Sequence, residues 1–261
     1  MPPRVSRRLF LAGAGAAVTL AGCSQAVRRS TATTVSPGAG VPGSGAPTTP
    51  APTSPTGRPA TYVPSGSRTG TAVALTFHGS GDLGLTNALL DQAKALRAPI
   101  TVFAVGNWLA ADQAIGHRIL ADGNELANHT FTHPDLGSLG AGAVAGEISR
   151  CADVLTRVQG NNGRWFRPSG LDRPTPLILQ QAGLAGYATS VGYDVDPLDY
   201  QDPGASRVIA RVQAGLQPGS IVSLHTGHAG TVQAFEPIVA AVRARGFRPV
   251  TVSQLLGPNP A

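Results

Sequence analysis

The chain has 261 residues, of which 33 are Gly and 22 are Pro, and a formal net charge of +6. Gly and Pro crowd into the first 70 positions, so the compact part is expected to span about 190 residues, the size of one large domain. Three arginines before residue 24 and four more before residue 71 account for the positive excess. The folded part therefore carries little net charge and has no basic stripe interleaved with aromatics, which argues against nucleic-acid binding.

Residues 1–23 predict an export signal. A basic start with three arginines precedes an apolar run that is too short to stay in a bilayer as a permanent helix. The run ends in Leu-Ala-Gly-Cys, which resembles a lipoprotein signal with Cys23 as the lipidated residue, and residues 6–11 also resemble the twin-arginine pattern. We expect an exported protein, anchored through lipid on Cys23 to the outer face of a bacterial cytoplasmic membrane. An ordinary secretory signal is the alternative.

Residues 24–70 are rich in Pro, Thr, Ser and Gly and contain no aromatic residue before Tyr62. Such a segment cannot bury enough apolar surface to offset the entropy of ordering, so we expect a disordered tether. It would let an anchored domain, residues 71–261, work at a distance from the membrane.

From residue 71 onward, strand and helix patterns alternate. Strands are expected at 71–77, 100–105, 125–128, 187–191, 220–224 and 250–252, and helices at 85–96, 108–120, 143–158, 176–181, 206–216 and 231–245. Repeated units of this length predict an α/β protein with a parallel sheet, open or closed into a barrel. With Cys23 assigned to the lipid, Cys151 has no disulfide partner, and its helical setting predicts a small buried residue.

A pair of histidines follows the strand expected at 125–128. His129 and His133 are four residues apart, so on a helical turn, or a loop that imitates one, both imidazoles can converge on a single divalent cation. The pair alone is a weak signal, because two histidines on one face can also be ordinary structural groups. Other polar segments, however, also follow expected strands, which is where α/β folds place their chemistry.

Five such segments occur in order: Thr-Phe-His-Gly-Ser-Gly-Asp at 76–82, His-Thr-Phe-Thr-His at 129–133, Arg-Pro-Ser-Gly at 167–170, Asp-Val-Asp-Pro-Leu-Asp-Tyr at 194–200, and Leu-His at 224–225. This succession resembles the polysaccharide deacetylase family, which has the NodB homology domain and is also known as carbohydrate esterase family 4. That family carries T-F-D-D-G-P, H-[ST]-x-x-H, R-x-P-[YF]-G, D-x-x-D-W and L-H in the same order. The resemblance covers residues 71–256.

The resemblance implies a distorted (β/α)7-type barrel and a divalent metal held by an Asp-His-His set. It also implies hydrolysis of N-acetyl or O-acetyl groups on a cell-envelope carbohydrate, such as peptidoglycan or another GlcNAc-containing polymer. Zn²⁺ is the expected metal, with Co²⁺ or Ni²⁺ as alternatives. Such a cation lowers the pKa of water and polarises the carbonyl of a poorly reactive acetamide. A monomer with a carbohydrate polymer as its partner is expected.

The first motif departs from the family. His78 and Gly79 stand where the family has two aspartates, one a base and one a metal ligand, and Asp82 follows three residues after Gly79. We expect the flexible Gly-Ser-Gly loop to turn Asp82 back to complete the metal shell with His129 and His133. His78 would then be the base or an extra ligand. The alternative is that Asp82 only caps the following helix.

The resemblance assigns roles to the later motifs as well. His225 would be the acid that protonates the departing amine, and Arg167 is expected to pair with Asp196 or Asp199. In the family such charges hold base and acid in register. Tyr200 stands where the family usually has Trp.

The third motif lacks the family's aromatic residue. Trp165 or Phe166 could offer a sugar-stacking face instead, or could be core residues. Two other function classes fit parts of the sequence. The altered first motif could mark a catalytically impaired, carbohydrate-binding relative. His-Gly-Ser-Gly at 78–81 is also similar to the oxyanion loop of α/β-hydrolase esterases, but the chain has no G-x-S-x-G nucleophile elbow.

Overall fold

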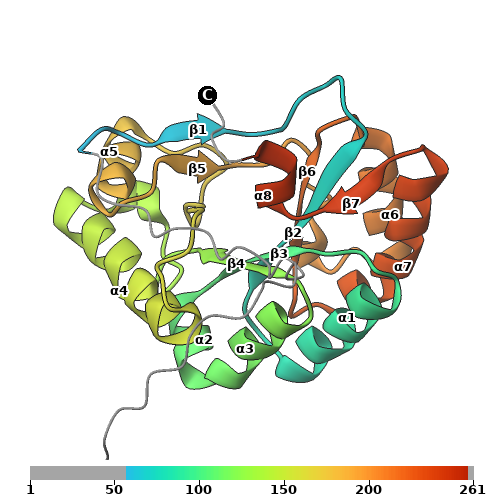
Figure 1. Cartoon of the computed structure of the whole chain (residues 1–261), viewed down its shortest axis with the longest axis horizontal. Coiled ribbons are helices and arrows are strands. Elements are labelled where there is room, and N and C mark those ends of the chain that lie inside the picture. Colours follow the sequence, from blue (N-terminus) through green and yellow to red (C-terminus); the bar gives the residue numbers. More distant parts are fainter. Residues whose placement is uncertain (1–56, 258–261) are drawn as a thin grey trace, which may run out of the picture. The chain divides into compact units, whose positions relative to one another are not determined.

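A computed structural model describes residues 57–257, so the predicted export signal lies outside the described residues. Within this part the chain alternates between strands and helices (Figure 1). The strands are β1 (Thr61–Val63), β2 (Ala72–Gly79), β3 (Thr101–Ala104), β4 (Glu125–Asn128), β5 (Thr189–Val191), β6 (Ile221–His225) and β7 (Arg248–Val250). The helices are α1 (Leu83–Ala95), α2 (Gly106–Ala111), α3 (Gln113–Ala121), α4 (Ala141–Gln159), α5 (Pro176–Leu184), α6 (Ala205–Gly215), α7 (Ala229–Ala244) and α8 (Val252–Leu256). Two 3-10 turns, η1 (Leu136–Ser138) and η2 (Asp199–Gln201), complete the set.

All strand pairs are parallel, as the alternation of strands and helices predicts. One sheet has the order β4-β3-β2-β6, with β7 also paired to β2, and β1 pairs with β5. Single bridges extend the pairing: Phe166 bridges Asn128 at the end of β4 and Ser190 of β5, and Val195 bridges Val222 of β6. The α/β class is thus confirmed. The strands follow one another as in a distorted barrel, in which single bridges replace continuous pairing on one side.

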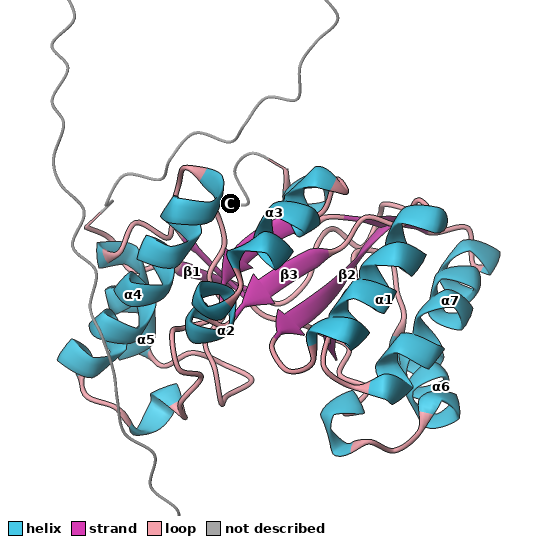
Figure 2. Ribbon diagram, turned by 90° about the horizontal axis from the view of Figure 1, so that it is seen from below, coloured by secondary structure: helices cyan, strands magenta, loops and turns pink. Residues whose placement is uncertain are grey.

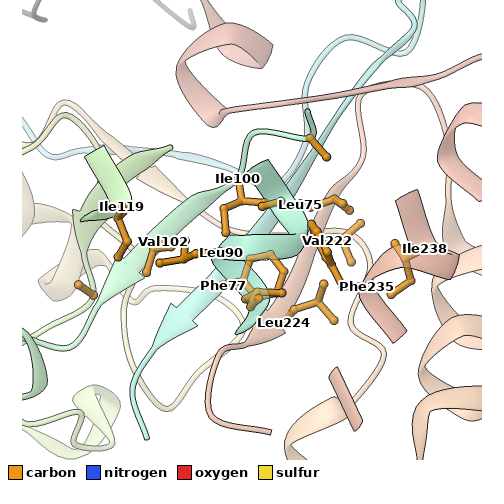
Figure 3. Close-up of a cluster of buried hydrophobic side chains, with 14 of the residues drawn as sticks. Leu75, Phe77, Leu90, Ile100, Val102, Ile119, Val222, Leu224, Phe235 and Ile238 are labelled. Atoms are coloured by element: carbon orange, nitrogen blue, oxygen red, sulfur yellow. The ribbon is translucent and has the colours of Figure 1, made fainter. Parts of the chain in front are cut away.

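Strand β2 is central to the fold because it is buried over almost its whole length. Since side chains alternate between the two faces of a strand, Val73, Leu75 and Phe77 point one way and Thr76 and His78 the other. The first set joins the main hydrophobic core with residues of α1, α3, α4, α6 and α7. Figure 3 shows Leu75 and Phe77 among Leu90, Ile100, Val222, Leu224 and Phe235. The second set lies on the face that carries the candidate site.

Helices α1, α3, α4, α6 and α7 pack on the same face of the sheet, opposite the candidate site. In Figure 2, α4 and α5 lie to the left of strands β2 and β3, and α1, α6 and α7 lie to the right. Helix ends follow local rules: Thr175 caps α5 by accepting a hydrogen bond from the N–H of Ile178, with Pro176 in the first turn. Gly160 ends α4 in a left-handed conformation at φ 78°. No helix among residues 57–257 is long and apolar enough to cross a membrane.

Three expected boundaries are corrected. The tether does not extend to residue 70, because β1 pairs with β5 and Ala60 is buried. The helix expected at 108–120 is two helices, because Asp112 takes an extended conformation and caps α3 through the N–H of Ala114. The last strand ends at Val250, because Thr251 forms a capping box with Gln254 and starts α8.

Candidate metal centre and active site

Three imidazoles meet where β2 and β4 end. His78 is in β2, and His129 and His133 lie in the loop that follows β4. One ring nitrogen from each lies within 4.8 Å of those of the other two. The ring centroids are 4.1 Å apart for His78 and His129 and 4.8 Å apart for His129 and His133. Among the described residues this is the group of three His, Cys, Asp or Glu side chains spaced to hold a metal ion.

His129 has the protonation pattern of a metal ligand. Its Nδ1 lies 3.0 Å from the carbonyl oxygen of Arg167, and because a carbonyl only accepts, Nδ1 carries the proton. Nε2 therefore has a free lone pair, is buried, and has no hydrogen-bond partner among the described residues. A histidine ligand is commonly held by such a bond from its other nitrogen.

His78 fits the same role through its other nitrogen. Its Nδ1 is buried without a partner in the described part of the chain, whereas Nε2 lies 3.4 Å from the Ser223 hydroxyl and 3.3 Å from an Arg167 nitrogen. In the tautomer with the proton on Nε2, that N–H points at Ser223 Oγ and the lone pair of Nδ1 is free for a cation. In the other tautomer Nε2 accepts a hydrogen bond from Arg167, which can only donate, so binding a cation through Nδ1 requires the first tautomer.

All three rings are neutral at neutral pH. Burial, together with the neighbouring imidazoles and Arg167, lowers the pKa of His78 and of His129 well below the usual value. Burial also lowers the pKa of His133, which lies at the exposed rim of the cluster. Metal ligation requires deprotonated imidazole, so the lowered pKa values keep the ring lone pairs available to a cation.

The loop that carries two of these histidines has an unusual backbone. Thr130 and His133 have φ values of 65° and 59°, in the left-handed region that β-branched and bulky residues rarely adopt. Glu147 of α4 holds the loop, because its carboxylate accepts hydrogen bonds from the N–H groups of Phe131 and Thr132 at 2.9 and 2.7 Å. The local sequence does not predict this role of Glu147, because the residue meets the loop only when α4 packs beside it.

Asp82 does not join the imidazoles, which corrects the expected Asp-His-His set. Its carboxylate is exposed and caps α1, accepting the N–H of Leu85 at 2.8 Å. The preceding loop is held away, since Trp108 donates to the carbonyl of Gly81 and Thr226 donates to that of Ser80. The alternative prediction, that Asp82 only caps the following helix, is therefore confirmed.

His225 ends β6 beside His78, its cross-strand partner, with ring centroids 4.4 Å apart. Its Nδ1 lies 2.8 Å from Asp199 Oδ1, and its backbone N–H donates to Oδ2 of the same carboxylate. Asp199 is 1 % exposed and also accepts the hydroxyl of Thr231 at 2.5 Å. A buried carboxylate that orients a histidine in this way prepares the ring for proton transfer.

Arg167 does not pair with Asp196 or Asp199, contrary to the expectation. The guanidinium is buried and donates to the Thr76 hydroxyl and to the carbonyls of Val191 and Gly192. It also stacks over the ring of Phe103, 4.0 Å from its centroid. Burial lowers the pKa of Arg167 to about 9, and one of its nitrogens lies 3.3 Å from His78 Nε2.

A cavity of about 280 Å³ opens over these groups. It is lined by His78, His133, Pro168, Gly170, Leu171, Asp172, Tyr193, Asp196, Tyr200, Ser223 and His225. Asp196 is half-buried, and burial raises the pKa of its carboxyl. Tyr200, 46 % exposed, lies with its ring centroid 5.3 Å from that of His225.

Trp165 and Phe166 belong to the core and do not form a sugar-stacking face. Both are buried, and the Trp165 ring nitrogen donates to Glu125 Oε1. Cys151 is a buried free thiol whose pKa is raised to about 12 by burial, as its helical setting predicts.

The chain is similar to known deacetylases. Residues 65–189 match the family described as Polysaccharide deacetylase. The chain is 32% identical to a chitooligosaccharide deacetylase of Bradyrhizobium sp. over 73% of this chain and 92% of that protein. It is 27% identical to peptidoglycan-N-acetylmuramic acid deacetylase PdaC of Bacillus subtilis, over 70% of this chain and 38% of PdaC. The crystal structure of the Bc1960 peptidoglycan N-acetylglucosamine deacetylase superposes with a TM-score of 0.70 at 27% identity, covering 74% of this chain and 92% of that one.

Proposed function

Because the chain belongs to the polysaccharide deacetylase family, we propose that it hydrolyses acetyl groups from a cell-envelope carbohydrate such as peptidoglycan or another GlcNAc-containing polymer. The observation that carries the proposal is that one cavity is lined by His78 and His133 of the three-histidine cluster and by His225, whose ring Asp199 holds. The relatives are named for chitooligosaccharide, N-acetylglucosamine and N-acetylmuramic acid substrates, and all these names share an N-acetylhexosamine.

We assign metal binding to His78, His129 and His133, with His78 in place of the family's aspartate. Three neutral imidazoles are a ligand set that Zn²⁺ accepts in catalytic sites, and Co²⁺ or Ni²⁺ are the alternatives. A divalent cation held there would lower the pKa of water towards about 7 and polarise the acetamide carbonyl. Because this set contains no carboxylate, it leaves the full positive charge of the ion to act on the substrate.

His225 is the proton donor to the departing amine. Asp199 fixes the proton on Nδ1, so Nε2 is the nitrogen that exchanges a proton with the substrate. The ring is held in place because Asp199 contacts both its Nδ1 and the backbone N–H of the same residue.

Asp196 is the residue we assign as proton acceptor for the attacking water. It lines the same cavity as His78, His133 and His225, and its raised pKa makes it a stronger base than an ordinary carboxylate. With His78 assigned to the metal, Asp196 and Asp172 are the carboxylates left among the cavity-lining residues, and Asp172 is engaged by Tyr193.

We further propose that the protein is exported and lipid-anchored through Cys23. The support is the sequence of residues 1–23 and the Pro- and Thr-rich composition that follows. An anchored deacetylase on a tether would reach wall polymer from the membrane surface.

The test compares His129→Ala with His117→Ala, a control that removes an exposed imidazole of α3 outside the cavity. Bound metal is measured by elemental analysis after dialysis, and acetate release is measured on chitooligosaccharides and peptidoglycan. We expect His129→Ala to lose the metal and at least about 1,000-fold of the activity, because the cation supplies both activated water and carbonyl polarisation. Retained activity in His129→Ala would refute the proposal.

The second candidate, a carbohydrate-binding relative without catalysis, is favoured by the altered first motif. Stoichiometric glycan binding by the unaltered protein, with no acetate release over a panel of divalent metals, would support that candidate instead.

A further inference from the structure

We propose that Asp172 is a specificity-determining residue that selects neutral N-acetylhexosamines and rejects sugars that carry a carboxylate. The inference rests on the proposed function in that it concerns the same cavity. It separates the two sugars of peptidoglycan in peptide-free glycan: N-acetylglucosamine is neutral, whereas N-acetylmuramic acid carries a lactyl group whose carboxylate is free when no stem peptide is attached.

Two tyrosines hold Asp172 at the cavity, one through its carboxylate and one through its backbone. The hydroxyl of Tyr193 donates to Oδ1 at 2.6 Å, and the hydroxyl of Tyr62 donates to the Asp172 backbone carbonyl at 3.0 Å. The side chain is exposed, and Oδ2 has no hydrogen bond to any described residue. Oδ2 is therefore free to accept a hydrogen bond from a sugar hydroxyl, at a position that the protein has already set.

Apart from the cation proposed on the histidines, the Asp, Glu, Lys and Arg side chains that line the cavity have one sign. Asp172 and Asp196 both line it, and none of the described lining residues is Lys or Arg. The buried Arg167 directs its donors to Thr76, to Val191 and Gly192, and to His78. The guanidinium of Arg173 lies over the ring of Tyr62, 5.6 Å from its centroid.

The two carboxylates are close enough to influence each other. The pKa of Asp196 is raised chiefly by burial, and the charges of Asp199 and Asp172 raise it further. A third carboxylate brought in by a substrate would meet the same repulsion in a partly buried site, where charges are screened less than in water.

A neutral sugar is attracted to Asp172 and not repelled by it. Its hydroxyls donate hydrogen bonds to the ionised carboxylate, and such charge-assisted bonds are stronger than neutral ones. The apolar faces of Pro168, Leu171 and Tyr193 complete the lining with surfaces that suit a pyranose ring. Attraction of one substrate class and repulsion of the other together produce specificity.

The test uses a charge series at one position, Asp172→Asn and Asp172→Lys, in the full-length protein. Asp153→Asn, on the exposed face of α4, is the matched control because it changes the net charge equally outside the cavity. Substrates are chitotetraose and a peptide-free peptidoglycan tetrasaccharide, with mass spectrometry to locate the sugar that loses its acetyl group. The ratio of kcat/KM on N-acetylmuramic acid to that on N-acetylglucosamine is the readout.

The unaltered protein is expected to act on N-acetylglucosamine. Asp172→Asn should raise the relative rate on N-acetylmuramic acid by roughly 10-fold, and Asp172→Lys should raise it further, since like-charge contacts disfavour wrong partners strongly. Asp153→Asn should leave the ratio unchanged. An unchanged ratio across the Asp172 series, or equal rates of the unaltered protein on both sugars, overturns the inference.

If no acetate is released, the inference is tested by measuring the affinity of the protein for the same two glycans by calorimetry. Preferential binding of the neutral glycan, lost in Asp172→Asn, would support the inference while the proposed function fails. Equal binding of the two glycans by the unaltered protein would reject the inference in either case.

Discussion

Asp199 holds His225 by two hydrogen bonds, one to the ring Nδ1 and one to the backbone N–H, each 2.8 Å long. The pair joins η2 to the end of β6, and His225 lines the cavity. The same carboxylate, itself buried, therefore sets both the tautomer and the orientation of the ring.

Asp199→Asn is expected to lower kcat by roughly 100- to 10,000-fold with little change in KM, because an amide can present an N–H to Nδ1 and favour the wrong tautomer. Steady-state kinetics on chitotetraose measures the effect. Asp202→Asn is the control, since Asp202 pairs with His228 outside the residues that line the cavity. Equal loss in both variants would show that the effect is structural and would contradict the role of Asp199.

The raised pKa of Asp196 has two consequences with opposite signs. Activity that needs the ionised base should fall as the pH drops through the raised pKa, so the acidic limb of the kcat/KM profile should lie above the usual range for aspartate. Stability behaves differently: the ionised form is penalised in the folded state, so stability falls as pH rises from the unfolded-state pKa to the folded-state pKa.

Asp196→Asn should therefore lose most activity at all pH values and, in metal-free protein at pH 7, should have a higher melting temperature. Calorimetric scans at pH 4 and pH 7 check the sign, since the gain should shrink at the lower pH. A lower melting temperature of Asp196→Asn at pH 7 would contradict the assigned burial effect.

Ser223 Oγ lies where it can accept a hydrogen bond from the N–H that His78 must carry on Nε2 if Nδ1 is to bind metal. Ser223→Ala should weaken metal binding by about 10- to 100-fold, the usual effect of losing a partner that orients a ligand. Titration of metal-free protein with Zn²⁺ measures this without reference to activity. Ser190→Ala is the matched control, because Ser190 is also buried but its hydroxyl has no partner among the described residues. Unchanged affinity in Ser223→Ala would remove His78 from the ligand set.

Glu147 holds the strained loop between two of the histidines. Glu147→Ala should destabilise the protein by about 2–4 kcal/mol, because the N–H groups of Phe131 and Thr132 lose a charged acceptor in a nearly buried setting. Metal affinity should fall as well, since the loop can relax from its left-handed conformations. Denaturant unfolding checks the first effect, with the exposed Glu236→Ala as control. A stability loss below about 0.5 kcal/mol, as for an ordinary surface residue, would refute the role.

Much of the fold was predictable because local patterns agree with the tertiary structure. Strand β4 was predicted with its observed bounds, and β2, β3 and β6 within two residues, since continuous apolar runs mark strands buried on both faces. The split between α2 and α3 was missed because an apolar period continues through Asp112, whose extended backbone ends the helix. Strand β1 was not predicted, because its composition resembles that of the tether. Only its pairing with β5 stabilises it as a strand.

The sequence by itself determined the candidate pair His129 and His133 and the histidine that ends β6, because motif order and fixed spacing along the chain are local properties. Only the tertiary structure decided that His78 approaches this pair while Asp82 caps a helix. His78 lies on the site face because side chains alternate along β2, which puts it on the same face as Thr76. Asp82 lies elsewhere because Trp108 and Thr226 hold the loop after the strand, and its carboxylate accepts the N–H of Leu85 in α1.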